Sequence, residues 1–330
     1  MAGIEHILRP VEQEYHTFEK AYDQILSSDS ATLNEVLRYI HSKRGKQLRV
    51  QLVLLAAAII RGVTPKTIQT ALALELLHTS TLVHDDVVDD SPMRRGGEAI
   101  QARWTNKIAV LVGDYLLAEV IRIVAELRNA RILSIVSKIG QSLAKGELLQ
   151  LHHGETMFIS EEQYFRVIEH KTAMLFAACM EAGAESTGAT LKQTNALKQF
   201  GLQLGICFQL KDDVFDFSDN EELGKPTMND IRDGKVTLPL LISLTRAPRE
   251  EADEIRSLCE ALATNSPAID PLEAEQTIKA FVMRYEGVRY AYQQMMAHKK
   301  EAMKALSVFH DSDIKTSLLA LLDYAINRTK

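Results

Sequence analysis

Cysteine and proline are both scarce in this sequence. The chain of 330 residues has 3 cysteines and 8 prolines. The cysteines form no CxxC pair and give no disulfide framework, which argues against a disulfide-rich secreted domain and favours a reducing compartment such as the cytoplasm. No proline lies between Pro92 and Pro226. Because proline breaks helix interiors, this stretch permits several long helices in succession.

Long apolar runs and a surplus of positive charge are also missing. The longest apolar run, 52–60, is too short for a membrane-spanning helix, which needs roughly twenty residues. The N-terminal region carries Glu5, Glu12 and Glu14 and has no apolar segment of the kind found in a secretory signal or transit peptide. The formal net charge of −6 gives no basic surface for general nucleic-acid binding. We therefore expect a soluble, cytoplasmic protein that does not bind nucleic acid.

The sequence does contain a helical pattern of apolar residues. With 46% hydrophobic and 25% charged residues, its composition is that of an ordinary globular protein. Apolar residues recur at i, i+3 and i+4 over 108–120, and strand patterns bounded by Asn-Gly or Asp-Gly turns are missing. Helix breaks fall at 27–30, 62–65, 91–97, 224–239 and 263–271, none of which resembles a flexible linker. We predict an all-α fold forming a single domain over residues 1–330.

Two clusters of carboxylates stand out because they lie among apolar neighbours. The first, DDVVD, occupies 85–89, and the second, DDVFD, occupies 212–216. On a helix, Asp86 and Asp89 lie about 100° and about 40° from Asp85, so the three carboxylates share one face. Like charges at this spacing destabilise a helix, and burial raises the cost, so a positive group must offset them. A single cluster is also compatible with a solvated helix face, but two copies favour a binding site.

All-oxygen ligand sets select hard cations such as Mg²⁺, which takes one or two carboxylates and completes its shell with water and substrate phosphate. Basic residues bracket the clusters, at 43–49 before the first and at 94–95 after it, with Lys171, Lys225 and Lys235 further along. Each taken alone is compatible with a solvated surface charge. No GxxxxGK[ST] or GxGxxG nucleotide motif is present. The pattern predicts two facing acidic walls that hold a diphosphate through Mg²⁺.

The motifs resemble those of the trans-isoprenyl diphosphate synthases. The resemblance rests on DDVVD with RRG at 94–96 and on DDVFD with GKPTMNDIRDGKVTLP at 224–239. RGKQLR at 44–49 is similar to the GKxxR element of that family, and HKTA at 170–173 to its KT motif. These matches follow the order of the family from about residue 40 to residue 240.

The resemblance implies antiparallel helices around a deep central cavity, and a homodimer. It also implies a reaction in which an allylic diphosphate, farnesyl or geranylgeranyl diphosphate, loses pyrophosphate and the double bond of isopentenyl diphosphate attacks the allylic cation. Two or three Mg²⁺ ions would assist the leaving group. The product would leave through a transient membrane contact.

The roles carried over by resemblance fall into four sets. The Mg²⁺ ligands would be Asp85, Asp86, Asp89, Asp212, Asp213 and Asp216. The contacts to the allylic diphosphate would be Arg94, Lys171, Lys225 and Lys235. The isopentenyl diphosphate site would comprise Lys46, Arg49, His78 and Arg95. The polar groups facing the cation would be Thr172 and Gln209.

Some positions depart from the family pattern, namely Arg44 and Val50 around the GKxxR element and Glu98 and Gln101 after RRG. Two residues separate the paired and final aspartates of the first motif, a spacing that resembles the long-chain branch.

Product length should depend on the helix face beneath Asp85. The expected pocket is formed by Leu74, Leu77, Ser80 and Thr81. Short-chain synthases resemble a tube closed by a large residue at the position of Ser80 or Thr81, and both are small here. Leu74 lies about 16 Å below Asp85 at 1.5 Å rise per residue. We therefore predict a C30–C40 product, with a floor supplied by a neighbouring helix near 121–127. Ser80 and Thr81 are also compatible with simple helix packing.

Other functions remain open. A short-chain farnesyl or geranylgeranyl diphosphate synthase would share the motifs. A class I terpene cyclase also pairs DDxxD with a second acidic motif, but it typically has Ser or Thr at the position of Asp216. An HD-type phosphohydrolase would use His84-Asp85 with His41 or His78, yet it leaves the second cluster unexplained. A non-catalytic subunit of a heteromeric synthase would usually lack one aspartate motif, and both are intact here.

Overall fold

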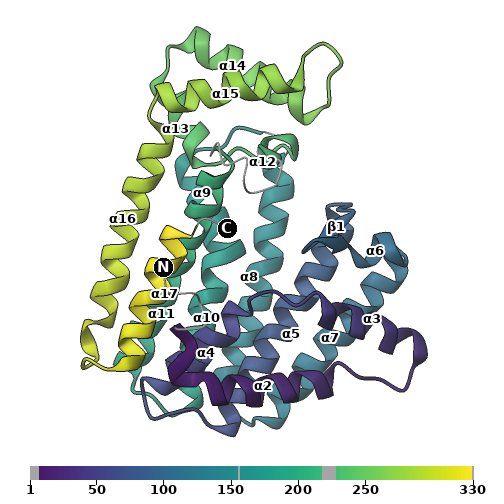
Figure 1. Cartoon of the computed structure of the whole chain (residues 1–330), viewed down its shortest axis with the longest axis vertical. Helices are drawn as coiled ribbons and strands as arrows, with labels where there is room; N and C mark the ends of the chain where they lie inside the picture. Colours follow the sequence, from purple (N-terminus) through teal and green to yellow (C-terminus); the bar gives the residue numbers. More distant parts are fainter. Residues whose placement is uncertain (1–6, 155–156, 218–227, 329–330) are drawn as a thin grey trace. The chain divides into compact units, whose positions relative to one another are not determined.

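The computed structural model describes residues 7–154, 157–217 and 228–328, with residues 150–154 and 229 described by their backbone alone. The prediction of an all-α fold is confirmed, since helices account for most of the described chain (Figure 1). They are η1 (Arg9–Val11), α2 (Glu12–Ile25), α3 (Ala31–Ser42), α4 (Leu48–Ala58), α5 (Pro65–Val88), α6 (Ile100–Arg103), α7 (Asn106–Glu126), α8 (Ala130–Gly154), α9 (Glu161–Ile168), η2 (Glu169–Ala173), α10 (Met174–Ser186), α11 (Leu191–Phe215), α12 (Asn229–Arg232), α13 (Leu238–Arg246), α14 (Arg249–Ala263), α15 (Pro271–Arg284), α16 (Gly287–Ala305), η4 (Leu306–Val308) and α17 (Asp313–Asn327).

A small β-hairpin is the exception to the helical prediction. Strands β1 (Met93–Arg94) and β2 (Gly97–Glu98) pair in antiparallel register, with Arg94 opposite Gly97. The two residues between them, Arg95 and Gly96, have φ of 49° and 70°, the backbone that type I′ hairpin turns require. The sequence predicted only a helix break here, because no alternating apolar pattern flanks the turn. The hairpin directly follows the DDVVD motif and orients both arginines.

The chain divides into two compact units, each built from separate stretches of sequence. The first comprises Met1–Leu143, Met174–Gly201 and Ala305–Leu321, and the second comprises Ala144–Ala173, Leu202–Lys304 and Leu322–Lys330. The prediction of one domain over 1–330 stays a prediction.

In the first unit, α5 packs beside α7, and α4 packs against both α5 and α10 (Figure 1). Their shared core includes Leu54, Leu74 and Leu116, which are fully buried. Helices α4 and α10 approach so closely that a Cβ on Gly183 would lie 2.4 Å from the carbonyl oxygen of Val53. A side chain at this position would therefore force the two helices apart.

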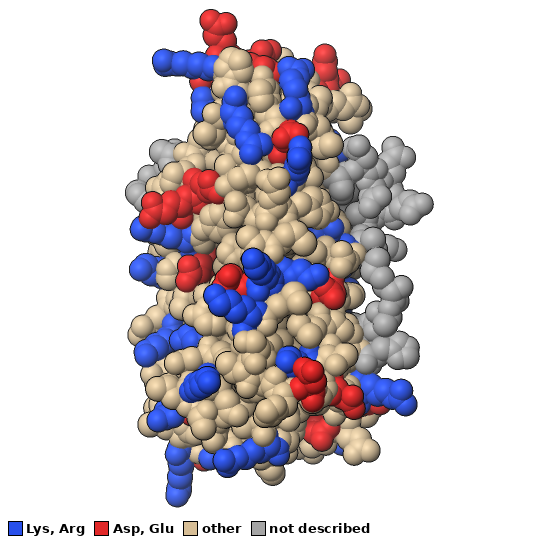
Figure 2. All heavy atoms as spheres, turned by 90° about the vertical axis from the view of Figure 1, so that its left-hand side faces the viewer, with Lys and Arg blue, Asp and Glu red and all other residues tan. Residues whose placement is uncertain are grey.

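In the second unit, α14 and α15 form a helical hairpin (Figure 1), and both contact α13. The break predicted at 263–271 separates α14 from α15. Helix α16 begins at Gly287, where a Cβ would lie 2.0 Å from the carbonyl oxygen of Pro239 on α13. Figure 2 shows lysine and arginine mixed with aspartate and glutamate on the face that it views, without a large patch of one sign. No described helix combines the length and the apolar character that crossing a membrane requires.

Candidate active site

The first aspartate motif lies at the C-terminal end of α5. The helix starts in a capping box formed by Thr64 and Thr67 and runs to Val88, so Asp85 and Asp86 occupy its last turn and Asp89 is its C-cap. The free carbonyl groups at a helix C-terminus carry partial negative charge. Three carboxylates at this end repel both the carbonyl groups and one another. The position therefore favours a bound cation more strongly than a helix interior would.

Asp86 already has a positive partner. Its side chain is buried, and Arg94 on β1 donates a hydrogen bond from Nε to Oδ1 over 2.6 Å, with a second guanidinium nitrogen also in contact. Burial raises the pKa of the Asp86 carboxyl, while the hydrogen bond and charge of Arg94 lower it in part. Arg94 was predicted to contact the allylic diphosphate, and here it binds the motif itself.

Gln101 secures the end of α5. Its amide nitrogen donates to the carbonyl oxygens of Asp86 (2.8 Å) and Ser91 (2.5 Å). The second of these carbonyls belongs to the turn that follows Asp89. In the sequence, Gln101 stands out only as a departure from the family pattern, because its partners are backbone atoms that no sequence motif reveals. In the structure it fixes the backbone that carries the motif.

Two of the residues predicted to bind isopentenyl diphosphate, Arg49 and Arg95, act through their charges on a third, His78. His78 is 7% exposed, and its pKa is lowered well below 6.5 by burial and by the charges of Arg49, Arg95 and Arg94. A neutral imidazole thus lies amid three guanidinium groups, an arrangement that suits an anion. Lys46 is exposed.

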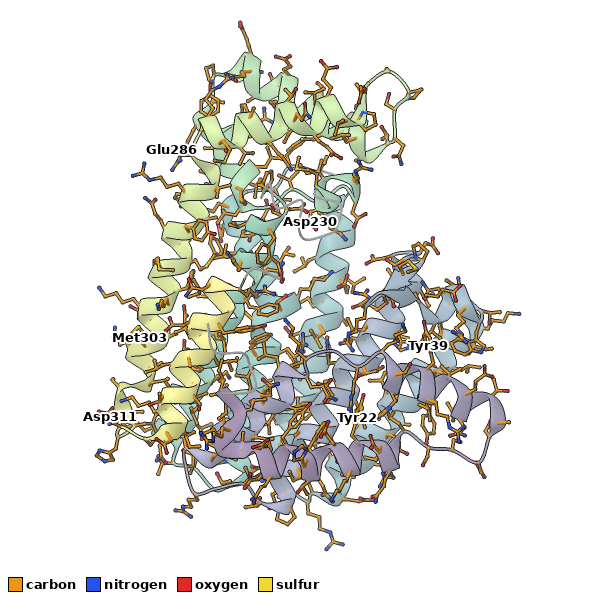
Figure 3. All side chains as sticks on the ribbon, in the orientation of Figure 1. Tyr22, Tyr39, Asp230, Glu286, Met303 and Asp311 are labelled. Atoms are coloured by element: carbon orange, nitrogen blue, oxygen red, sulfur yellow. The ribbon has the colours of Figure 1, made fainter. Side chains whose placement is uncertain are left out.

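A small pocket of about 50 Å³ opens beside these arginines. Its polar lining includes Lys43, Asp86, Arg94 and Arg95, and its apolar lining is Ile40, Leu82, Val83, Ala99 and Ile100. The segment before α4 packs against Arg95, whose guanidinium donates to the carbonyl oxygen of Lys43 over 3.3 Å. Tyr39 (Figure 3) also lines the pocket and donates to the carbonyl oxygen of Glu98 over 2.7 Å. Lys43 was not predicted as a site residue, and it adds a third positive group to this pocket.

The residues predicted to form the product pocket all belong to α5, and the pocket itself stays a prediction. Leu74 and Leu77 are buried, and Thr81 is partly exposed. Ser80 is fully buried, and its hydroxyl donates to the carbonyl oxygen of Gly113 on α7 over 2.9 Å. The side chain of Ser80 thus takes part in the packing of α5 against α7. In the segment expected to supply the floor, Ile123, Val124 and Leu127 are buried, whereas Ile121 is 70% exposed.

The second aspartate motif belongs to the second unit, where it too lies at a helix C-terminus. Helix α11 ends at Phe215, so Asp212 and Asp213 are in its last turn and Asp216 follows it. Asp212 forms an ion pair with Arg328, whose guanidinium lies 2.7 Å from Oδ1 and 3.9 Å from the ring centroid of Phe208. The prediction that the two motifs face each other stays a prediction.

Asp213 is the most buried carboxylate of the six, at 1% exposure. Gln209 donates to its Oδ1 over 2.9 Å, and the hydroxyl of Tyr164 on α9 donates to its Oδ2 through a short hydrogen bond. Burial and the charge of Asp230 raise the pKa of Asp213 well above its ordinary value, and these two hydrogen bonds lower it in part. Both carboxylate oxygens therefore have protein partners.

Asp230 on α12 (Figure 3) is a carboxylate that sequence reasoning missed. Its backbone N–H donates to Oδ2 of Asp216 over 3.1 Å. Burial and the charge of Asp216 raise the pKa of Asp230 to about 7. The signal was present, because Asp230 lies within the segment 224–239 that carried the resemblance.

Lys171 and Thr172 lie in η2, a short π-helical segment between α9 and α10. Such segments are rare in proteins, and many of those that occur lie at functional sites. The Thr172 hydroxyl donates to Oε1 of Gln209 over 2.8 Å, so the structure brings together the two residues predicted to face the cation. Lys171 pairs with Glu147 at 2.8 Å, and Lys235 lies 3.5 Å from Asp233. Lys225 lies outside the described residues.

The chain is similar in sequence and in structure to several known proteins. A family model described as polyprenyl synthetase matches residues 30–272. An octaprenyl diphosphate synthase of Haemophilus influenzae is 34% identical over 304 residues, which cover 92% of this chain and 90% of that protein. The crystal structure of a decaprenyl diphosphate synthase from Rhodobacter capsulatus matches with a TM-score of 0.91 and 31% identity over 99% of both chains. That of a geranylgeranyl pyrophosphate synthase from Bacteroides thetaiotaomicron matches with a TM-score of 0.83 and 38% identity, covering 98% of this chain and 99% of that one.

Proposed function

Because the chain belongs to the polyprenyl synthetase family and is a prenyltransferase, we propose that it makes an all-trans polyprenyl diphosphate. It would join isopentenyl diphosphate head to tail, 1′ to 4, onto an allylic diphosphate, either farnesyl or geranylgeranyl diphosphate. The observation that carries the proposal is that each aspartate motif lies at the C-terminal end of a long helix with an arginine against it. Carboxylates at the negative C-terminal ends of two helices are suited to bind divalent cations, and these cations in turn bind the diphosphate groups of the substrates.

The donor set fits Mg²⁺. Among the described side chains, no three carboxylate, histidine or cysteine groups form a ready-made metal site. Mg²⁺ usually takes one or two carboxylates and fills its shell with water and substrate phosphate, so a site of this kind is complete only with the diphosphate. We propose that two or three Mg²⁺ ions are held by Asp85, Asp86, Asp89, Asp212, Asp213 and Asp216. When bound, these ions would neutralise charge on the diphosphate leaving group.

The basic residues would hold the two diphosphates. Those assigned to isopentenyl diphosphate are Lys46, Arg49, His78 and Arg95, and those assigned to the allylic diphosphate are Arg94, Lys171, Lys225 and Lys235. The first set is supported by His78, whose pKa is lowered well below 6.5 by burial and by the charges of Arg49, Arg95 and Arg94. A neutral imidazole keeps one N–H group, which can donate a hydrogen bond to an anion. Arginine grips diphosphate oxygens in bidentate fashion.

The reaction needs three events at the bound substrates. The C1–O bond of the allylic diphosphate breaks, the double bond of isopentenyl diphosphate forms a new bond to C1, and a proton leaves to restore a double bond. Preorganised positive groups stabilise the charge that develops on the departing diphosphate. The oxygens of Thr172 and Gln209, fixed by the hydrogen bond between them, would stabilise the allylic cation.

We propose a C30–C40 product. No aromatic side chain lies one turn before Asp85, where Thr81 and Ser80 are small. The names of the similar proteins run from geranylgeranyl to decaprenyl diphosphate synthases, so a short-chain synthase is the alternative outcome of the product analysis.

We also propose a homodimer. Helix α7 exposes large apolar side chains along one face, including Leu111 (68%) and Ile121 (70%), and α8 exposes Leu133 (52%) in the same unit. Such a stripe suits a second copy of the chain. Ile121→Glu should shift the protein toward monomer in sedimentation velocity, whereas Leu191→Glu, at an equally exposed site on α11, should not. A dimer of unchanged strength in Ile121→Glu would contradict this interface.

The deciding experiment is incubation of the purified chain with radiolabelled isopentenyl diphosphate, farnesyl diphosphate and Mg²⁺, followed by sizing of the products. We expect elongated prenyl diphosphates, none after removal of Mg²⁺, and losses of orders of magnitude in Asp85→Ala and Asp212→Ala with unchanged circular dichroism. Hydrocarbon released from the allylic substrate alone would instead indicate a terpene cyclase. Hydrolysis of nucleotides with Mn²⁺ would indicate a phosphohydrolase.

A further inference from the structure

We propose that Tyr164 is a positioning residue for this reaction, acting through Asp213 to set the orientation of the Gln209 amide. The proposal rests on the proposed function. It assigns a role to a tyrosine outside every motif singled out in the sequence. It also gives Asp213 a task beyond that of a metal ligand.

The geometry is a continuous chain of three hydrogen bonds within the second unit. Tyr164 donates to Oδ2 of Asp213, Gln209 donates from Nε2 to Oδ1 over 2.9 Å, and Thr172 donates to Oε1 of Gln209 over 2.8 Å. The participants come from α9, α11 and η2. Tyr164 and Asp213 are 3% and 1% exposed. Water therefore has little access to the inner end of the chain.

Donor and acceptor chemistry gives this chain a direction. The edge of Gln209 that faces Asp213 is its NH₂ group, because Nε2 donates a hydrogen bond to Oδ1 of the carboxylate. The carbonyl oxygen must then point the opposite way, toward Thr172. Oε1 of Gln209 accepts a hydrogen bond from the Thr172 hydroxyl, and each of these two oxygens keeps a lone pair that makes no hydrogen bond in this contact. These are the oxygens proposed to face the allylic cation.

Tyr164 makes this orientation stable. Without it, Oδ2 of a buried carboxylate would lose its donor, and such groups are costly to leave without a partner. With one of its two hydrogen-bond donors gone, the Asp213 carboxylate would be held less firmly, and so would the NH₂ group of Gln209 that donates to it. The oxygen of Gln209 would point toward the cation only part of the time.

A purely structural role for Tyr164 is the competing interpretation, because its ring also packs edge-on against Phe165 at 5.3 Å. The substitution Tyr164→Phe separates the two, since it keeps the ring and removes only the hydroxyl. We expect kcat to fall roughly 10–100-fold, the loss of one hydrogen bond to a charged group. The KM values for both substrates should change less than about twofold, because neither substrate contacts Tyr164 in this proposal.

Tyr290→Phe is the matched control. Tyr290 also donates to a carboxylate, Oε1 of Glu161 on the same helix α9, over 2.7 Å. Within the described part of the chain, none of its hydrogen bonds leads to Gln209. This variant should keep wild-type kcat. A loss in Tyr290→Phe equal to that in Tyr164→Phe would assign both effects to helix anchoring and overturn the proposal.

A double-mutant cycle with Gln209→Leu gives the decisive readout. If Tyr164 acts through Gln209, Tyr164→Phe should lower kcat less than about twofold when Gln209 is already absent. Equal effects in both backgrounds would overturn the proposal. Asp213→Asn is a second variant, because an asparagine must turn its NH₂ group toward one of the two donors, Tyr164 or Gln209. We expect a larger loss of kcat than in Tyr164→Phe. Wild-type kcat in this variant would contradict the mechanism.

Binding of Mg²⁺ with inorganic pyrophosphate, measured by calorimetry, completes the test. Tyr164→Phe should weaken this binding much less than it lowers kcat, and a loss of binding as large as the loss of kcat would overturn the proposal. Failure of the proposed function looks different, because the wild-type chain itself would then not elongate an allylic diphosphate.

Discussion

Arg328 lies against Asp212, with its guanidinium 2.7 Å from Oδ1, its face over the ring of Phe208 and a further hydrogen bond to the carbonyl oxygen of Phe208. Phe208 and Asp212 lie one turn apart on α11, so this arginine covers the face of the helix end that carries the second aspartate motif. Its charge occupies a position where a divalent cation is proposed to bind.

We predict that Arg328→Gln strengthens Mg²⁺ binding. Removing a competing charge from Asp212 should lower the half-saturating Mg²⁺ concentration roughly 2–10-fold, a typical range for an ion pair of modest strength. Calorimetric titration of Mg²⁺ in the presence of inorganic pyrophosphate measures this. Arg246→Gln is the control, because Arg246 in the same unit bonds only to the backbone carbonyls of Tyr285 and Glu286 among its described hydrogen bonds. Weaker Mg²⁺ binding in Arg328→Gln would show that the arginine helps to build the site instead.

Loss of the Gln101 amide should loosen the end of α5. Gln101→Leu removes two part-buried hydrogen bonds to backbone carbonyls, each worth about 0.5–1.5 kcal/mol, so the free energy of unfolding should fall by about 1–3 kcal/mol. Denaturant titration measures the change. Gln101→Glu tests the same contact by replacing the amide donor with a carboxylate, which cannot donate to the carbonyl oxygens of Asp86 and Ser91. Wild-type stability in both variants would contradict the capping role.

The buried His78 predicts a loss of stability in acid. Its pKa in the folded protein lies well below 6.5, while the unfolded chain has the ordinary value. As the pH falls through about 6.5, the unfolded chain binds a proton that the folded protein does not, so the free energy of unfolding declines. Thermal unfolding between about pH 7.5 and pH 5 should therefore show a smaller decline in His78→Gln than in the wild type. His310→Gln, at an exposed histidine, should follow the wild type, and parallel curves for all three proteins would count against a neutral His78.

Thr81→Phe should shorten the product. Thr81 is partly exposed one turn before Asp85, so an aromatic ring there would narrow the proposed tube without entering the interior of the α5–α7 contact. Chain length measured by thin-layer or liquid chromatography should shift to smaller products. Ser80→Phe is a poorer test, because Ser80 is fully buried against Gly113 and a ring would separate the two helices. An unchanged product profile in a stably folded Thr81→Phe would place the tube elsewhere.

The all-α fold could be predicted from the absence of proline over a long stretch and from the spacing of apolar residues. The absence of proline from 93–225 and the apolar spacing over 108–120 predicted long helices, and α7, α8 and α11 occupy much of this stretch. The hairpin after DDVVD was missed because four paired residues carry no strand pattern. What distinguishes this hairpin from a loop is the pairing of its two strands and the positive φ of Arg95 and Gly96, and neither is visible in the sequence.

The candidate site was predicted unevenly for a physical reason. Aspartates repeated among apolar residues are conspicuous in one dimension, so both motifs were visible. The roles of Gln101, Tyr164 and Asp230 depend on partners that lie 14 to 49 positions away or on backbone atoms. Such contacts arise only when helices pack, and no local pattern records them. Ser80 illustrates the same limit, because its size suggested an open tube while its hydroxyl contacts a neighbouring helix.

The bond between Ser80 and the Gly113 carbonyl also limits sliding of α7 along α5. If a side chain on α7 stops the growing product, the aspartate motif and the stopping residue lie on different helices, α5 and α7. The distance between them sets the product length, and it stays constant only if α5 and α7 keep the same register. A slip by one turn would move the stop by about 5.4 Å. A single hydroxyl would therefore help to determine whether the enzyme releases one product or a mixture of neighbouring lengths.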